Sequence, residues 1–169
     1  MVPDISGFHG VFVVGHVLGV LLFVLAHGVS AAVLWRVRYE RDPAALRTLL
    51  DLSRRSYGLA VVGFLVWFLA GIVAGFSGNW WTSGRYWIWA SLVIAIVVTA
   101  VMTPFGRIYF NRIRESLGID AKTGAIDPAF QVDRESLDGV ISSGQPQLLV
   151  VFGVGGLAVM AWLMIAKPF

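Results

Sequence analysis

The chain contains no cysteine, and only 14% of its 169 residues are charged. Without cysteine it can form no disulfide, no iron–sulfur cluster, no Cys-ligated zinc site and no c-type haem attachment. Globular domains carry about a quarter charged residues, whereas here 57% of residues are hydrophobic and the mean hydropathy is +0.78. This composition excludes a soluble enzyme, a disordered chain and a nucleic-acid-binding module, although the pI is near 9.7. We therefore expect an integral membrane protein.

Four stretches of the chain are long and apolar enough to cross about 30 Å of hydrocarbon as helices. They cover residues of about 8–35, 57–76, 86–110 and 146–166. The first contains no Asp, Glu, Lys or Arg and is too long for the apolar region of a signal peptide, so we expect a span and not a cleaved signal. The sequence thus predicts an all-α fold, a four-helix transmembrane bundle that forms a single integral membrane domain over residues 1–169.

The two longer connections each contain an Asp-Pro pair, in which an acidic N-cap precedes a proline at the first helical position. After Asp42-Pro43, leucines are interspersed with arginines. After Asp127-Pro128, apolar and acidic residues fall on different faces of a helix. We therefore expect a short amphipathic helix at the inner membrane surface in each connection. For the second connection, a solvated linker is the alternative.

Positive charge is concentrated in the same two connections. The first carries Arg36, Arg38, Arg41, Arg47, Arg54 and Arg55, and the second carries Arg112, Arg114, Lys122 and Arg134. Loops rich in arginine and lysine stay on the cytoplasmic side of a membrane. We therefore expect both long connections in the cytoplasm and both termini outside, in the inner (cytoplasmic) membrane of a bacterium.

No Asp, Glu or Lys lies inside any expected span, which argues against a proton- or ion-coupled transporter. The first span instead holds three histidines, His9, His16 and His27, at spacings of 7 and 11 residues. At 100° per residue, each spacing is within about 20° of whole turns, so the three imidazoles project from one stripe. This stripe is typical of haem or copper ligands. The alternative is that each imidazole forms a structural hydrogen bond across the bundle.

Spans two to four contain no histidine, so a second ligand must be something else. The site can be five-coordinate, two copies can share a haem, or methionine can be the sixth ligand. By depth in the membrane, we expect Met102 near His27 and Met160 near His16, with Met164 closer to the outer surface. The expected haem b residues are His16, His27, Met102 and Met160, and the expected copper ligands are His9, His16, His27 and Met164. Methionine as apolar filler is the alternative.

Small residues four apart indicate where helices approach closely. Gly15 and Gly19 form such a pair in the first span. If two copies share a haem, we expect a homodimer through this span, with the two glycines at the contact. The pair also flanks His16, so it can equally admit a flat macrocycle against the helix backbone.

The sequence resembles an uncharacterised bacterial family of four-helix membrane proteins, a domain of unknown function. The resemblance lies in His16-Val17-Leu18-Gly19, His27-Gly28-Val29-Ser30-Ala31-Ala32, Arg41-Asp42-Pro43 and Leu52-Ser53-Arg54-Arg55-Ser56, and in the Trp-rich turn before the third span. That family is distantly similar to a wider group that contains copper-resistance protein D and the haem-binding protoporphyrinogen oxidases of bacteria. Members of this group have a histidine near the start of the first helix, and His16 is the best match to it. The resemblance implies a b-type haem and porphyrin chemistry on one branch, and metal passage or sensing on the other. The intramembrane lysine that the oxidase branch uses has no counterpart here.

Three functions remain open at this point. The first is a membrane haem or copper protein with a redox or metal-handling role. The second is a non-catalytic subunit or assembly partner whose histidines are structural. The third, an enzyme that oxidises porphyrins, depends on the resemblance alone.

Overall fold

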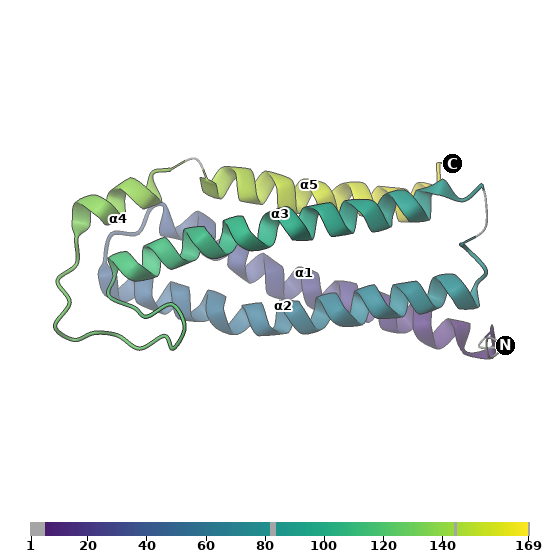
Figure 1. Cartoon of the computed structure of the whole chain (residues 1–169), viewed down its shortest axis with the longest axis horizontal. Helices are drawn as coiled ribbons and strands as arrows, with labels where there is room; N and C mark the ends of the chain where they lie inside the picture. The colour runs from purple at the N-terminus through teal and green to yellow at the C-terminus, as the bar shows by residue number, and fades with distance from the viewer. Residues whose placement is uncertain (1–5, 82–83, 144, 169) are drawn as a thin grey trace.

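The chain is a bundle of long helices in the computed structural model, which describes residues 6–81, 84–143 and 145–168 (Figure 1). After a 3-10 turn, Ser6–Phe8, the helices are α1 (His9–Val37), α2 (Pro43–Ser77), α3 (Tyr86–Ser116), α4 (Arg134–Ile141) and α5 (Gln145–Ala166). Four helices within the described residues are long and apolar enough to cross a membrane. The all-α prediction with four long apolar helices is therefore confirmed, and the helices are those expected of a multi-pass membrane protein.

The first connection differs from the prediction. Asp42 is an N-cap as expected, because its carboxylate accepts hydrogen bonds from the amides of Ala44 and Ala45, each at 3.2 Å. The helix that starts there is not a separate amphipathic segment, however, but the first turns of α2. No proline or glycine interrupts the chain from Ala44 to Tyr57, so the helix continues directly into the second apolar stretch.

The second connection also differs, because Asp127-Pro128 starts no helix. The Asp127 carboxylate accepts a hydrogen bond from the Ala129 amide at 2.9 Å, and the Asp127 amide donates to the Gly118 carbonyl. These bonds form a turn that returns the chain toward the end of α3. The amphipathic helix is α4, which begins six residues after Pro128 with Asp133 as its N-cap.

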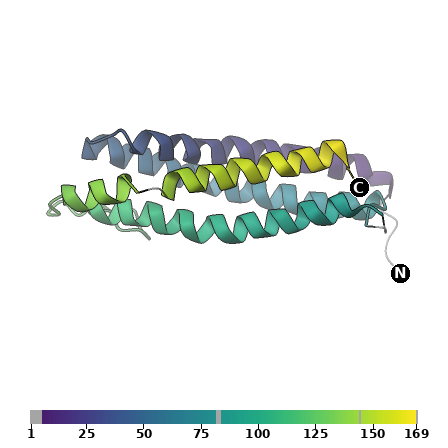
Figure 2. The same cartoon turned by 90° about the horizontal axis from the view of Figure 1, so that it is seen from above.

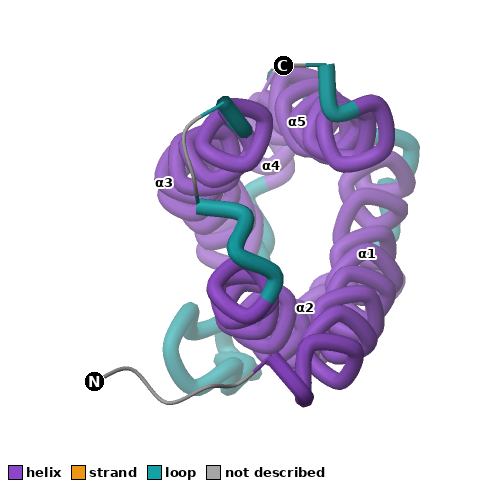
Figure 3. The backbone as a smooth tube through the Cα atoms, turned by 90° about the vertical axis from the view of Figure 1, so that its right-hand side faces the viewer, coloured by secondary structure: helices purple, strands orange, loops and turns teal. Residues whose placement is uncertain are grey.

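α1 and α2 form one closely packed pair, as an end-on view shows (Figure 3). A Cβ at Gly19 would collide with the backbone of Trp67, and a Cβ at Gly63 would lie 2.6 Å from the amide nitrogen of Phe23. Gly15 faces the same partner helix. Gly15 and Gly19, where we expected a homodimer contact, therefore pack against α2 of the same chain. A single chain does not test dimer formation, but a dimer would need another surface.

α3 and α5 form the second pair (Figure 2). At one end of the bundle, all five α-helices share a core that contains Val33, Val37, Leu46, Leu50, Tyr109, Ile113, Leu137, Ile141 and Leu149. At the other end, where both termini lie, a smaller core contains Trp87, Ile88 and Leu163 (Figure 1). The first core joins the two pairs, whereas the second lies within the α3–α5 pair, with Trp80 and Trp81 of the α2–α3 connection packed against it. We call the end of the bundle that holds the five-helix core the arginine-rich end, because the α1–α2 connection and the last turns of α3 lie there.

The outer surface of the bundle is apolar. The exposed fractions of Ile165, Leu25 and Val11 are 84%, 71% and 67%. Soluble monomers rarely expose large contiguous apolar surface, whereas lipid chains solvate such side chains at no cost. The exposed surface is therefore consistent with the membrane-spanning lengths of the helices.

The α1–α2 contact predicts a difference between two glycines of the same helix. Gly19→Ala places a methyl group in the backbone of Trp67, so we expect a loss of about 1–3 kcal/mol of stability from overpacking. Gly28→Ala is the matched control, since no atom lies within 4 Å of its added Cβ. Thermal unfolding in detergent, followed by circular dichroism, measures both. Equal midpoints for the two variants would contradict the close approach of the helices.

Candidate functional site

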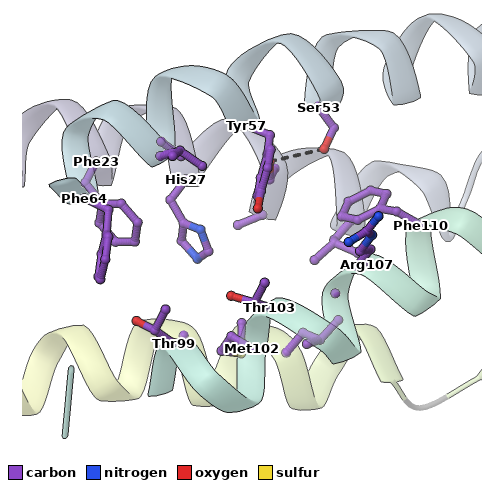
Figure 4. Close-up of a pocket in the computed structure, with 18 of the residues that line it drawn as sticks. Phe23, His27, Ser53, Tyr57, Phe64, Thr99, Met102, Thr103, Arg107 and Phe110 are labelled. Carbon is purple, nitrogen blue, oxygen red and sulfur yellow. Dashed lines mark hydrogen bonds between the residues drawn. The ribbon is translucent and has the colours of Figure 1, made fainter. Parts of the chain in front are cut away.

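A cavity of about 610 Å³ lies between the two helix pairs, and all four long helices line it (Figure 4). Small-molecule sites in proteins are typically about 300–1,000 Å³ and mostly apolar. The walls here are largely aromatic and aliphatic, with Phe23 from α1, Phe64 and Trp67 from α2, and Phe110 from α3. The size and lining are those of a site for one apolar or amphipathic molecule.

His27 points from α1 into this cavity (Figure 4). Its ring stacks on Phe23, with a centroid separation of 5.3 Å and an interplanar angle of 11°. Among the residues that the structure describes, neither ring nitrogen of His27 has a hydrogen-bond partner. His27 is half-buried and lines the cavity, so its imidazole is accessible to a ligand there.

The other two histidines of the stripe are engaged with α2. The Nδ1–H of His16 donates to the Trp67 carbonyl oxygen at 2.9 Å, and a Cβ at Gly71 would lie 2.5 Å from that nitrogen. His9 Nδ1 lies 2.8 Å from Ser77 Oγ. Both imidazoles therefore form structural hydrogen bonds across the bundle, the alternative that the sequence left open, while His27 does not.

His27 and Met102 meet over a glycine of α5. A Cβ at Gly153 would lie 3.1 Å from Met102 Cε and 3.2 Å from His27 Nε2. Side chains from α1 and α3 thus converge on one point of α5, and any side chain at position 153 would occupy the space between them. The structure therefore brings together the pair that the sequence placed at one depth.

The remaining predicted ligands do not join this pair. Met160 is buried and lines the cavity, but none of the contacts described for His16 involves it. Met164 on α5 has an exposed fraction of 36%. Within the described ranges there is no group of three or more His, Cys, Asp or Glu that could hold a metal. The three histidines of the expected copper set thus do not form such a group in the described structure, and copper binding by that set stays a prediction.

The sequence analysis missed the polar side of the cavity. Arg54 of α2 and Arg107 and Arg114 of α3 line it, together with Thr99 and Thr103. A signal for the α3 residues is present in the sequence, because Thr99, Met102, Thr103, Gly106, Arg107, Phe110, Asn111 and Arg114 repeat every three or four residues. Residues at this spacing lie on one face of a helix. Arg54 gives no comparable signal, because it lies on another helix.

Comparison of the chain with protein-family models, with curated proteins and with solved structures gives no match. The resemblance to a bacterial four-helix family therefore stays a prediction. What the site can do is argued from its own geometry.

The contrast between His16 and His27 predicts different effects on stability. His16→Phe removes the bond to the Trp67 carbonyl, so we expect a loss of about 0.5–1.5 kcal/mol. His27→Phe keeps a ring stacked on Phe23 and removes nitrogens that have no partner in the described structure, so we expect a smaller change. The measurement is thermal unfolding of the cofactor-free protein in detergent. A larger loss for His27→Phe would mean that His27 has a structural partner.

Proposed function

We propose that this chain is a multi-pass membrane protein that binds a b-type haem in its central cavity, where His27 would be a ligand of the iron. The observation that carries the proposal is the imidazole of His27, directed into a cavity of about 610 Å³ without a hydrogen-bond partner among the described residues. Neutral imidazole is a common ligand of haem iron. A bound haem would supply a one-electron iron couple inside the membrane.

The residues around His27 fit a flat aromatic ligand. Phe23 holds the imidazole by stacking, which limits rotation of its ring. Phe64 and Trp67 contribute further aromatic surface, and Gly153 leaves free the point at which Nε2 is directed. Met102 brings its terminal methyl group to the same point, and its thioether sulfur would be the second protein ligand, as in His/Met cytochromes. In this proposal His27 and Met102 hold the group, and the aromatic walls exclude water from it.

Copper is a second candidate because of the same pair. Imidazole nitrogen and thioether sulfur together suit Cu(I), and Met102 Cε and His27 Nε2 both approach Gly153. A copper site built from these two residues would lack a third His, Cys, Asp or Glu in the part of the chain that is described. The size and aromatic lining of the cavity favour haem. Porphyrin oxidation, the activity implied by one branch of the resemblance, additionally requires a demonstrated substrate.

Absorption spectra of the protein purified in mild detergent from haem-replete cells test the proposal. We expect a Soret band in the oxidised protein and sharp α and β bands after dithionite reduction. His27→Ala removes the proposed ligand and is expected to abolish these bands. His9→Ala, which breaks contacts with Ser77 and Trp80 outside the cavity lining, is expected to retain them.

A second pair of variants controls for misfolding. Gly153→Leu fills the point where His27 and Met102 converge, so haem is expected to be lost. Gly155→Leu adds the same side chain on the same helix. No atom lies within 4 Å of a Cβ at Gly155, so haem is expected to remain. A colourless wild type that also contains no copper on metal analysis would overturn the cofactor proposal and favour a non-catalytic subunit with structural histidines.

We also propose that the arginine-rich end faces the cytoplasm of a bacterium, with both termini outside the inner membrane. The support is the concentration of arginine in the two long connections. Because the chain has no cysteine, single cysteines report the topology without background. In intact spheroplasts, a membrane-impermeant maleimide is expected to label Pro168→Cys and to label Lys122→Cys only after lysis. The reverse pattern would invert the proposed orientation.

A further inference from the structure

Three arginines line the cavity toward the arginine-rich end, Arg54 from α2 and Arg107 and Arg114 from α3. Arg54 and Arg107 are exposed and Arg114 is half-buried, so all three are accessible from the cavity. The described lining residues include no Asp or Glu. The cavity therefore carries three positive charges at one end and no carboxylate.

In the part of the chain that the structure describes, none of these three arginines forms an ion pair. Ion pairs within the described residues join Arg36 to Glu40, Arg41 to Asp138 and Arg55 to Asp51, so they involve other arginines. A guanidinium group stays protonated in proteins, so its charge cannot be removed by titration. Positive charge next to an apolar cavity is stabilised by an anion that occupies the cavity.

Contacts within the chain position two of the three guanidinium groups. Arg114 Nη1 donates to Asn111 Oδ1 at 3.1 Å, and its Cζ lies 5.8 Å from the centroid of the Phe110 ring. The guanidinium of Arg54 lies against Gly124 in the α3–α4 connection, where a Cβ would occupy the same space. Gly124 has a φ of +74°, which L side chains rarely adopt, so this close approach depends on glycine.

The turn that contains Gly124 is itself held by hydrogen bonds. Asp120 Oδ1 accepts from the Thr123 amide at 2.6 Å and from the Lys122 amide at 2.9 Å. These bonds, led by that from Thr123, hold the pKa of Asp120 below its usual range. The carboxylate of Asp120 is thus engaged within the turn, and Gly124 of the same turn lies against Arg54.

The same face of α3 carries both the apolar and the cationic part of the lining. At 1.5 Å per residue, Arg107 lies about 8 Å and Arg114 about 18 Å beyond Met102 along the helix axis. A ligand that reaches from the His27–Met102 point to the arginines is therefore amphipathic, with its anionic groups at one edge.

We propose that Arg54, Arg107 and Arg114 form a subsite for the anionic oxygen groups of an amphipathic ligand whose apolar part occupies the cavity beside His27. Arginine binds carboxylate and phosphate groups through paired N–H donors. The inference rests on the proposed function for the identity of the ligand: in the haem-bound protein, the anionic groups are the two propionates. The phosphate of an anionic lipid has the same chemistry and is the second source.

Metal-free protoporphyrin IX and its dimethyl ester separate this subsite from iron ligation. Both compounds lack iron, so His27 does not contribute a metal bond, and they differ only in the carboxylates. Their dissociation constants are measured by fluorescence in phosphatidylcholine nanodiscs. From wild type to Arg107→Gln/Arg114→Gln, we expect the preference for the free acid over the ester to fall about tenfold or more, the equivalent of about 1.4 kcal/mol.

Two further variants keep the test independent of folding. Arg112→Gln removes a charge from the same helix but outside the cavity lining and is expected to keep the preference of the wild type. The double variant Arg107→Lys/Arg114→Lys retains both charges and is expected to restore part of the preference for the free acid. An unchanged preference in the double glutamine variant, or equal loss in Arg112→Gln, would overturn the subsite.

A lipid arm identifies the source of the anionic group. If the phosphate of an anionic lipid occupies the subsite, replacing zwitterionic phosphatidylcholine by anionic phosphatidylglycerol weakens binding of the free acid by the wild type but not by Arg107→Gln/Arg114→Gln. If the subsite selects the carboxylates, the lipid has no such effect.

The result is distinguishable from failure of the proposed function. A protein without a haem spectrum that still prefers the free acid keeps the subsite and loses the haem proposal. A protein that binds haem through His27 but shows no preference for the free acid keeps the haem proposal and loses the subsite.

Discussion

Apolar side chains gain little by leaving lipid for one another, so helices in a membrane associate where small residues allow their backbones to touch. Gly19 and Gly63 provide that contact between α1 and α2, each against the backbone of the other helix. The contact fixes the rotation of α1 about its axis. With that rotation His9 and His16 bond to α2, whereas His27, on the same stripe but further along α1, lies at the cavity, so position along the helix separates them. The division of roles among the three histidines therefore follows from where each lies along α1.

The same packing explains why the bundle encloses a cavity. α3 and α5 form their own pair, which shares a core with α1 and α2 at the arginine-rich end, while the core at the other end lies within the α3–α5 pair. Between those cores, aromatic and aliphatic side chains line a space of about 610 Å³ in which no side chain fills the point over Gly153. Cores of proteins are normally close-packed. A cavity of this size, with an imidazole and three arginines at its wall, is therefore more consistent with binding than with simple structural packing.

Several parts of this arrangement could be predicted from periodicity, and others could not. The common stripe of the histidines and the common depth of His27 and Met102 depend only on helix geometry, which is local. The N-cap at Asp42 was predicted correctly, but the same Asp-Pro pattern at Asp127 forms a turn, because tertiary contacts with the end of α3 compete with helix formation there. Local signals indicate where a helix can begin. They do not determine whether it does.

Composition and hydropathy alone determined that this chain has four long apolar helices, because a residue's preference for lipid or water does not depend on its partners. Only the tertiary structure decided which imidazole is bonded to α2 and which faces a cavity, since the three share one stripe and differ in what packs against it along α1. It also decided that Gly15 and Gly19 pack within the chain, and that Arg54 lies on the same cavity as Arg107 and Arg114. Such relations join residues that are far apart in sequence, and hydropathy and helical period describe one segment at a time.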